Sequence, residues 1–165
     1  MSVEPGLPRR SPFGPQGPPL GFLVASVGAG TMASFRDALA PHGVHPRQFA
    51  LLRALAACDG QSQQELSRAL HVPPGRLVPL VDDLQDRGLL ERRQSASDRR
   101  IRTLHLTGPG QVLLVALLRS VAGHEERLLA GLSPADREQL KGLLGRVAGA
   151  LGLQRDEHPG MTGDL

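Results

Sequence analysis

The fold of this chain is set by SQQELSRALHVPPGRLVPLVDDLQDRGLLERRQSASDRRIRTLHLT, residues 62–107. Ser62 and Glu65 have the spacing of a capping box, which predicts that a short helix begins there. Pro74 cannot continue that helix but suits the first turn of a second one, which Gly88 is placed to end. Apolar residues recur in this second segment at three- and four-residue spacing: Leu77, Leu80, Val81 and Leu84. Two helices joined by so short a turn cross steeply, so the pattern predicts a helix-turn-helix.

The residues after this pair predict a two-stranded hairpin. Residues 89–93 and 100–106 have the composition of short strands, and the polar residues 94–99 between them lack helical periodicity. Residues 92–102 contain five arginines and a single acid, Asp98; the arginines are Arg92, Arg93, Arg99, Arg100 and Arg102. Arginine side chains bind phosphate oxygens and enter narrow minor grooves. A helix pair followed by such a hairpin is typical of a winged helix-turn-helix. The alternative is a small α+β domain with a solvated charged loop.

The rest of the chain predicts a mainly α fold in which this small β-hairpin is the wing. Four further helices are expected at 20–40, 46–58, 107–130 and 133–151. The helix at 20–40 is too apolar to stand alone, which favours a partner, and the helix at 107–130 is apolar on several sides, which predicts that it is buried. Residues 1–19 are rich in proline and glycine and are expected to be a disordered tail, and residues 154–165 a flexible one.

Length and composition fit one intracellular domain. The chain has 165 residues, with nineteen basic and sixteen acidic side chains, so its net charge is +3, and its pI is near 10.3. Arginine supplies eighteen of the nineteen basic residues. Arginine side chains are well suited to contacts with phosphates and bases. A GC-rich genome, however, would raise the arginine content equally. Four Phe and no Trp or Tyr argue against a platform that stacks single-stranded bases. One cysteine, and no apolar run long enough for a membrane span or signal peptide, predict a cytoplasmic protein without membrane contact.

The chain lacks the motifs of common enzyme sites. It has no glycine-rich phosphate loop, no G-x-S-x-G and no paired-histidine motif. Its six histidines and one cysteine show no tight metal-ligand spacing. We therefore expect no enzyme activity, no cofactor and no metal site.

The segment DRRIRTLHLTGPG, residues 98–110, resembles the wing of the MarR family of bacterial transcriptional regulators. The family's Asp-x-Arg falls on Asp98 and Arg100, its Leu-Thr on Leu106 and Thr107, and its following glycine on Gly110. Segments 45–56, 64–70 and 80–93 resemble the family in the same order. The resemblance covers roughly residues 20–153 and implies a single domain. In it, residues 45–107 form the winged helix-turn-helix, and residues 20–44 and 108–153 form helices that interlock two subunits into a dimer.

The resemblance implies a sequence-specific, double-stranded DNA-binding regulator that acts as a homodimer. A two-fold dimer places its two recognition helices roughly 34–36 Å apart in successive major grooves, so it reads a near-palindromic operator. Repression relieved by a small aromatic or anionic effector is the family default. Two alternatives remain open: a winged-helix module that holds a protein partner, and a regulator that has lost sequence-specific DNA binding.

The expected DNA contacts lie on the helix pair and the wing. Arg76 is the residue of the second helix's first turn that can make a bidentate contact to guanine, and plain phosphate contact is the alternative. By resemblance, Arg100 pairs with Asp98 to shape the wing while Arg99 enters the minor groove, and the assignment between these two arginines is open. The family usually carries a polar residue where Pro79 stands, and this proline should kink or tighten its turn. The candidate DNA-binding residues are Gln63, Arg68, Pro74, Gly75, Arg76, Val78, Pro79, Arg99, Arg100 and Arg102.

An effector site is less visible in the sequence. Four polar residues fall near the region where the family binds effectors: Arg36, His42, His45 and Arg53. Any of them could pair with a carboxylate, and surface or interhelical roles are the alternative. Cys58 could sense oxidants, but the end of a helix disfavours its thiolate, so a structural thiol is the simpler interpretation.

Overall fold

The structure is a computed structural model that describes residues 12–95, 98 and 100–153. Its elements are α1 (Leu20–Leu39), the short 3-10 helix η1 (Ala40–His42), α2 (Pro46–Ala57), β1 (Gln61–Ser62), α3 (Gln63–Ala69), α4 (Pro74–Asp86), β2 (Leu90–Gln94), β3 (Arg102–Leu106), α5 (Gly108–Leu128) and α6 (Pro134–Ala150). The expected mainly α fold with a small β wing is therefore confirmed.

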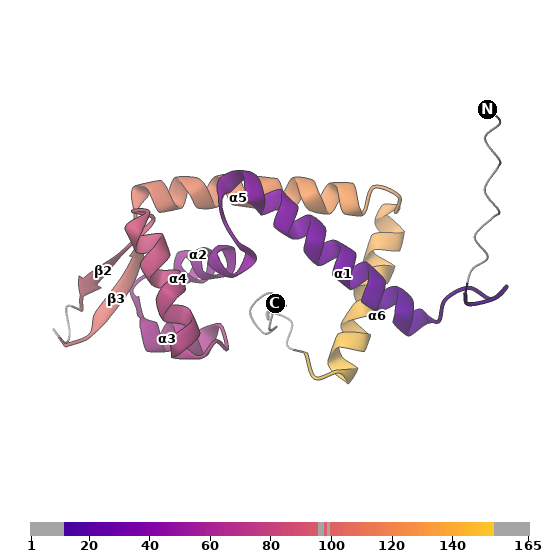
Figure 1. Ribbon diagram of the computed structural model, residues 1–165, viewed down its shortest axis with the longest axis horizontal. Coiled ribbons are helices and arrows are strands. Elements are labelled where there is room, and N and C mark those ends of the chain that lie inside the picture. Colours follow the sequence, from indigo (N-terminus) through magenta and orange to yellow (C-terminus); the bar gives the residue numbers. More distant parts are fainter. Residues whose placement is uncertain (1–11, 96–97, 99, 154–165) are drawn as a thin grey trace, which may run out of the picture.

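A lobe at one end of the molecule holds α2, α3, α4 and the sheet (Figure 1). The long helix α5 runs from this lobe to the opposite end, where α6 and the start of α1 lie, and α1 runs from there back toward the lobe. Helix α1 packs against α5, and α5 also contacts α2 and β3. The lobe is thus joined to the far end by α1 and α5.

The sheet has three antiparallel strands in the order β1-β3-β2, so the expected two-stranded hairpin is incomplete. The added strand is β1, whose Gln61 and Ser62 pair with Leu104 and Thr103 of β3. Strand β2 pairs with β3 from Leu90↔Leu106 to Gln94↔Arg102, and both strands are slightly displaced from the predicted ranges.

Local chemistry sets the helix ends as the sequence predicted. The Ser62 hydroxyl accepts a hydrogen bond from the Glu65 amide at 3.3 Å, and the Glu65 carboxylate accepts one from the Ser62 amide at 2.7 Å. The Glu65 carboxylate accepts from both the amide and the hydroxyl of Ser62, and these two bonds hold the pKa of Glu65 below its usual value. Pro74 is the first residue of α4, and Gly88, with a φ of 67°, turns the chain out of it.

The core lies inside the lobe. Phe35 of α1 meets Phe49 of α2 edge to face at 5.8 Å, which joins α1 to the lobe. The largest fully buried side chains are Phe49, Leu39, Leu51, Leu52, Leu55, Leu66, Leu77, Leu84, Leu90, Leu104, Leu117 and Val81.

The other end of the molecule leaves much apolar surface uncovered in the single chain. Helix α6 has no buried residue, and α1 buries only Phe35 and Leu39. Within one chain α5 is buried on one side only: Leu114 and Leu117 are buried, whereas Val112 is 73% exposed, and the expected burial of its other side between two subunits stays a prediction. Contacts within the protomer therefore bury only part of the apolar faces of α1, α5 and α6. Other exposed apolar side chains here are Phe22, Leu23, Val24, Val27, Val115, Leu118, Leu140, Leu143, Leu144 and Val147.

Among the residues described, no helix has the length and apolar character needed to cross a membrane.

Candidate nucleic-acid interface

Helix α4 presents its first two turns to solvent. Leu77, Val81 and Leu84 are buried and hold this helix on the core. No side chain caps its start, and a Cβ added at Gly75 would meet nothing within 4 Å. An extended ligand can therefore approach the backbone of this turn closely. The predicted contact residues on the outer face are all exposed: Pro74, Gly75, Arg76, Val78 and Pro79.

Helix α4 runs unbroken from Pro74 to Asp86, with Pro79 inside it. Proline has no amide hydrogen, so it cannot donate to the carbonyl of Gly75 four residues earlier. The predicted kink or tightening at this turn stays a prediction. Pro79 offers no hydrogen-bonding side chain, which leaves Arg76 as the charged residue of the first two turns of α4.

Helix α3 places the two predicted phosphate contacts at its opposite ends. Gln63 is the first residue of the helix and is half-buried, and Arg68 lies in the last turn and is exposed. Both belong to the helix that precedes α4, as the first helix of a helix-turn-helix does.

Two of the five arginines counted in the wing are paired with acids in the folded chain. Arg92 of β2 donates to Asp82 Oδ1 and to Gln85 Oε1, both at 2.6 Å and both on α4. Arg93 donates to Glu91 of its own strand. The interpretation of these two residues as part of a positive hairpin tip is therefore wrong. Arg92 instead ties the wing to α4.

The tip of the wing is organised by Asp98. Its Oδ1 accepts a hydrogen bond from the backbone amide of Arg100 at 2.9 Å, and its carbonyl accepts one from the amide of Ile101 at 3.0 Å. The expected Asp98–Arg100 contact thus exists, but through the backbone; within the described part of the wing, these two side chains form no ion pair. The side chains of Arg100 and Arg102 are exposed. Arg99, the other predicted contact, lies outside the described residues.

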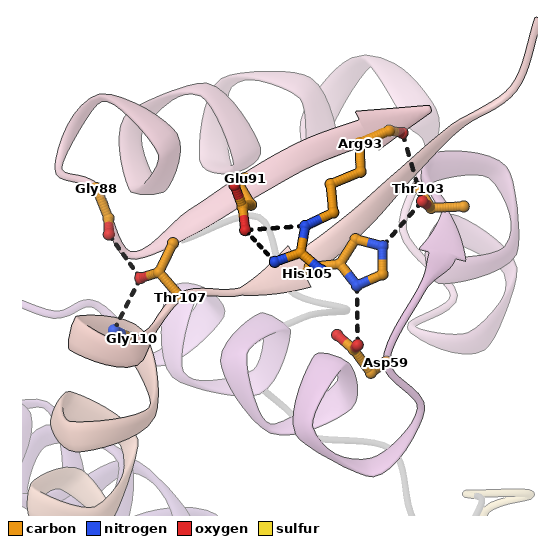
Figure 2. A network of polar contacts seen from close by, with 8 residues as sticks. All are labelled: Asp59, Gly88, Glu91, Arg93, Thr103, His105, Thr107 and Gly110. Atoms are coloured by element: carbon orange, nitrogen blue, oxygen red, sulfur yellow. Dashed lines mark hydrogen bonds and ion pairs between the residues drawn. The ribbon is translucent and has the colours of Figure 1, made fainter. Parts of the chain in front are cut away.

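The base of the wing is held by contacts that the sequence did not reveal (Figure 2). His105 of β3 bonds to Asp59 Oδ2 at 2.8 Å and to Thr103 Oγ1 at 2.9 Å, which ties the turn after α2 to the wing. Asp59 and His105 are 46 residues apart, and no motif relates them.

A second junction joins the wing to α5. The Thr107 hydroxyl donates to the Gly88 carbonyl at 2.7 Å and accepts from the Gly110 amide at 3.1 Å, as Figure 2 shows. The Thr107 amide donates to the Leu89 carbonyl at 3.2 Å. A Cβ on Gly110 would lie 2.0 Å from that carbonyl oxygen, so only glycine fits this position without a shift.

The four candidate effector residues take part in the fold. The His42 ring bonds to Ser120 of α5 at 2.8 Å, and Arg53 lies over the Phe49 ring at 5.9 Å. His45 is the N-cap of α2, and its Nδ1 accepts from the Arg47 amide at 3.3 Å. Arg36 donates to the carbonyl of Met32, one turn earlier in α1, at 3.4 Å. These contacts favour interhelical and capping roles.

His45 and Arg36 lie close enough to interact electrostatically. Burial lowers the pKa of His45 from 6.5, and the positive charges of Arg47 and Arg36 lower it further. Cys58 is exposed at the end of α2. In the part of the chain that the structure describes, no cluster of three or more His, Cys, Asp or Glu could hold a metal ion.

Known proteins resemble this chain in both sequence and fold. A model of the MarR family matches residues 42–101. A putative transcriptional regulatory protein for the hcr operon of Thauera aromatica is 34% identical over 122 residues, which are 72% of this chain and 74% of that protein. An HTH-type transcriptional repressor of Mycobacterium tuberculosis is 31% identical over 129 residues, which are 78% of this chain and 93% of that protein.

Solved structures agree. The transcriptional repressor CouR bound to a 23-mer DNA duplex is 33% identical, with a TM-score of 0.70 over 79% of this chain and 92% of that one. A mutant of E. coli MarR complexed with operator DNA is 25% identical, with a TM-score of 0.67 over 78% of this chain and 93% of that one. The chain therefore belongs to the MarR family and is a transcriptional regulator rather than an enzyme.

Proposed function

We propose that this chain is a repressor that binds a near-palindromic double-stranded DNA operator as a homodimer and is released by a small aromatic or anionic effector. The observation that carries the proposal is the exposed outer face of α4 with Arg76 in its first turn, next to a wing with exposed Arg100 and Arg102. An exposed helix start fits the major groove, and a basic hairpin fits the adjacent backbone or minor groove. Such a protein would work in the bacterial cytoplasm.

In this proposal the contacts divide into two kinds. Arg76 reads a base edge, whereas Gln63, Arg68, Arg100 and Arg102 hold the phosphates and fix the register. Pro74, Gly75, Val78 and Pro79 form the apolar remainder of the α4 surface and let the DNA approach. With no other charged side chain on that surface, recognition would lean on Arg76, on the wing and on DNA shape.

The uncovered apolar faces of α1, α5 and α6 support the homodimer. A second copy of the same chain offers the same faces, and a two-fold arrangement is the commonest way to cover them. Dimerisation would also bring two copies of α4 to one duplex. Two linked weak interfaces bind DNA much more tightly than one.

The proposed effector would bind where α1 meets α2. Arg36, His42, His45 and Arg53 lie at or near the corner between α1 and α2, and an anionic ligand would have to displace contacts such as His42–Ser120. Breaking such contacts on binding is the means by which an effector would move the lobe relative to α5. A panel of aromatic carboxylates that releases bound DNA would identify the ligand class.

The proposal is tested by titrating the protein against DNA from upstream of its own gene at several salt concentrations. Three phosphate-binding arginines in each protomer, Arg68, Arg100 and Arg102, would give a dimer a log–log salt slope of about −5. Arg76→Ala should weaken operator binding by about 1–3 kcal/mol and relax the preference at one base pair. Arg100→Ala should weaken binding to all sequences and lower the slope by about 1 for each phosphate that is no longer bound. Arg119→Ala, an exposed arginine of α5, is the matched control, and gel filtration must show that its dimer is unchanged because α5 also carries part of the proposed dimer surface.

A winged-helix module for a protein partner is the second candidate. It is favoured by the apolar character of the exposed α4 surface, where Val78 is 39% exposed beside Pro74 and Pro79. Binding of a protein to such a surface would depend little on salt. A flat salt response and equal affinity for all DNA sequences would reject the repressor and favour this module.

A further inference from the structure

Gln48 is one of three buried polar or charged residues among those described, and both the oxygen and the nitrogen of its amide are hydrogen-bonded. It lies in the first turn of α2 and is 9% exposed. Its Oε1 accepts a hydrogen bond from the backbone amide of His45 at 2.8 Å, and its Nε2 donates to Asp83 Oδ2 of α4 at 2.6 Å. One buried amide therefore links the start of α2 to the recognition helix of the proposed DNA complex.

The chemistry of both partners fixes the orientation of this amide. A backbone N–H can only donate, so it must meet the oxygen of Gln48, and a carboxylate can only accept, so it must meet the nitrogen. Glutamate at position 48 would place a carboxylate against that of Asp83. An apolar residue would leave the backbone amide of His45 without its partner.

The same corner is tied to α5 on one side and to α4 on the other. His42, six residues before Gln48, bonds to Ser120 of α5 at 2.8 Å. On the other side, Asp83 Oδ2 also pairs with Arg87 at 3.4 Å, and a Cβ on Gly43 would lie 3.9 Å from the Arg87 guanidinium. The corner formed by residues 42–48 thus contacts both α5 and the carboxyl half of α4.

Asp83 is well placed to control the DNA-facing end of α4. It follows Arg76 by seven residues, so the two lie about 10 Å apart along the axis and within about 20° of the same face. The buried Leu77, Val81 and Leu84 hold α4 on the core through apolar contacts, which resist separation but are not directional. The hydrogen bond from Gln48 is directional and acts on the helix edge that carries Arg76.

We propose that Gln48 is a positioning residue, which sets the rotation and the axial position of α4 relative to α2 and α5 through its bond to Asp83. The inference rests on the proposed DNA binding for its consequence, which is the presentation of Arg76 to the operator. Gln48 itself touches no DNA, and it acts on affinity and selectivity only through α4.

The test uses the full chain with Gln48→Glu, Asp83→Asn and the double variant. In Gln48→Glu the two carboxylates repel each other. In the double variant the amide of residue 83 donates to the new carboxylate, which still accepts from His45, so the link is rebuilt with its direction reversed. Asp83→Asn alone keeps an acceptor oxygen for Gln48 and is the matched control.

For DNA binding, Gln48→Glu should weaken operator binding by about 2- to 30-fold. Its ratio of operator to random-DNA affinity should fall, while the salt slope stays that of the wild type, because every side chain that binds phosphate is still present. The double variant should recover both affinity and ratio. A merely structural glutamine would lower the unfolding temperature without changing the selectivity ratio, and that result would overturn the proposal.

A second readout is independent of DNA. Spin labels on Arg76→Cys and Arg119→Cys, in a Cys58→Ser background, report the distance from α4 to α5. The labelled protein is mixed with an excess of unlabelled protein, so that a dimer holds at most one labelled protomer and the distance is that within one protomer. The distance distribution should shift or broaden in Gln48→Glu and recover in the double variant. If Gln48→Glu does not fold, Asp83→Ala, at a half-exposed position, removes the same bond from the other side.

The two readouts separate the possible failures. An unchanged label distance in Gln48→Glu, or in Asp83→Ala where that variant is used, overturns the positioning role whatever the DNA results are. A wild-type protein that selects no DNA sequence overturns the proposed repressor instead, and the label distances then still decide whether Gln48 positions α4.

Discussion

Replacing Gly110 with alanine should force α5 away from the base of the wing. A Cβ at this position would lie 2.0 Å from the Leu89 carbonyl oxygen and 3.0 Å from its carbon. Both are backbone atoms, so no side-chain rotation relieves the contact. Because real contacts of this kind are not shorter than about 3.0 Å, α5 or the segment at Leu89 must move by at least 1.0 Å.

The magnitude follows from what that movement breaks. The Leu89 carbonyl accepts the amide hydrogen of Thr107 at 3.2 Å, and a further 1.0 Å takes this pair beyond hydrogen-bonding distance. Overpacking contributes about 1–3 kcal/mol and the broken bond about 1 kcal/mol, so Gly110→Ala should lower the free energy of unfolding by about 2–4 kcal/mol. For a chain of this length, that corresponds to a fall of about 4–16 °C in the unfolding temperature.

The assay is thermal unfolding by circular dichroism at one fixed protein concentration, because the stability of the proposed dimer would depend on concentration. Gly108→Ala is the matched control: it lies in the same first turn of α5, and its Cβ would meet nothing within 4 Å. It should be neutral or slightly stabilising, since alanine is the better helix former. If Gly110→Ala and Gly108→Ala unfold at the same temperature, the close approach of position 110 to the Leu89 carbonyl does not restrict the residue there, and the reasoning fails.

Three further predictions concern the wing, the start of α2 and the recognition helix. Arg92→Gln should weaken DNA binding without reducing the salt slope, because Arg92 bonds to Asp82 and Gln85 of α4. Arg93→Gln is the control, because the partner of Arg93 lies in its own strand. A salt slope reduced by about 1 per contact in Arg92→Gln would show that Arg92 binds phosphate instead. The pKa of His45 is below 6.5 in the folded chain, so the unfolded chain takes up the proton first and stability should fall as the pH drops below 6.5, until the folded pKa is passed. His45→Asn keeps a capping side chain and should flatten this part of the stability curve; an unchanged curve would contradict the assignment. Pro79→Ala should raise the free energy of unfolding by about 1–3 kcal/mol, measured by urea unfolding, because the new amide can donate to the Gly75 carbonyl; no gain would mean that the proline is not strained there.

The helix-turn-helix was predictable because its boundaries depend on neighbouring residues. The Ser62–Glu65 capping box, the proline that opens α4 and the left-handed glycine after it are all local, and the structure has each of them where it was predicted. Strand β1 was not predictable in the same way. It consists of two residues that become a strand only by pairing with β3, about forty residues later.

The candidate site was predicted less well, because composition does not show which charges are paired. Five arginines in sequence suggested one positive tip, but the carboxylate that neutralises Arg92 comes from α4, ten residues earlier in the chain. Likewise, nothing in the sequence marks Gln48 as buried or Asp59 as a partner of His105. Such contacts depend on the packing of elements against each other, which periodicity within one element does not describe.

The amino-terminal half of α1 has little to keep it helical in a lone protomer. It begins without a side-chain cap or a first-turn acid, its buried residues are confined to its carboxyl half, and a methyl group at Gly21, Gly28 or Gly30 would meet no neighbour within 4 Å. Amide hydrogens in this half should therefore exchange rapidly with solvent in the monomer, at low protein concentration, and slowly in the proposed dimer, where a second copy would cover the exposed face. Ordering of the half-helix and association then form a single equilibrium. The entropy lost in that ordering makes association weaker and more temperature-dependent than the buried apolar area alone would give.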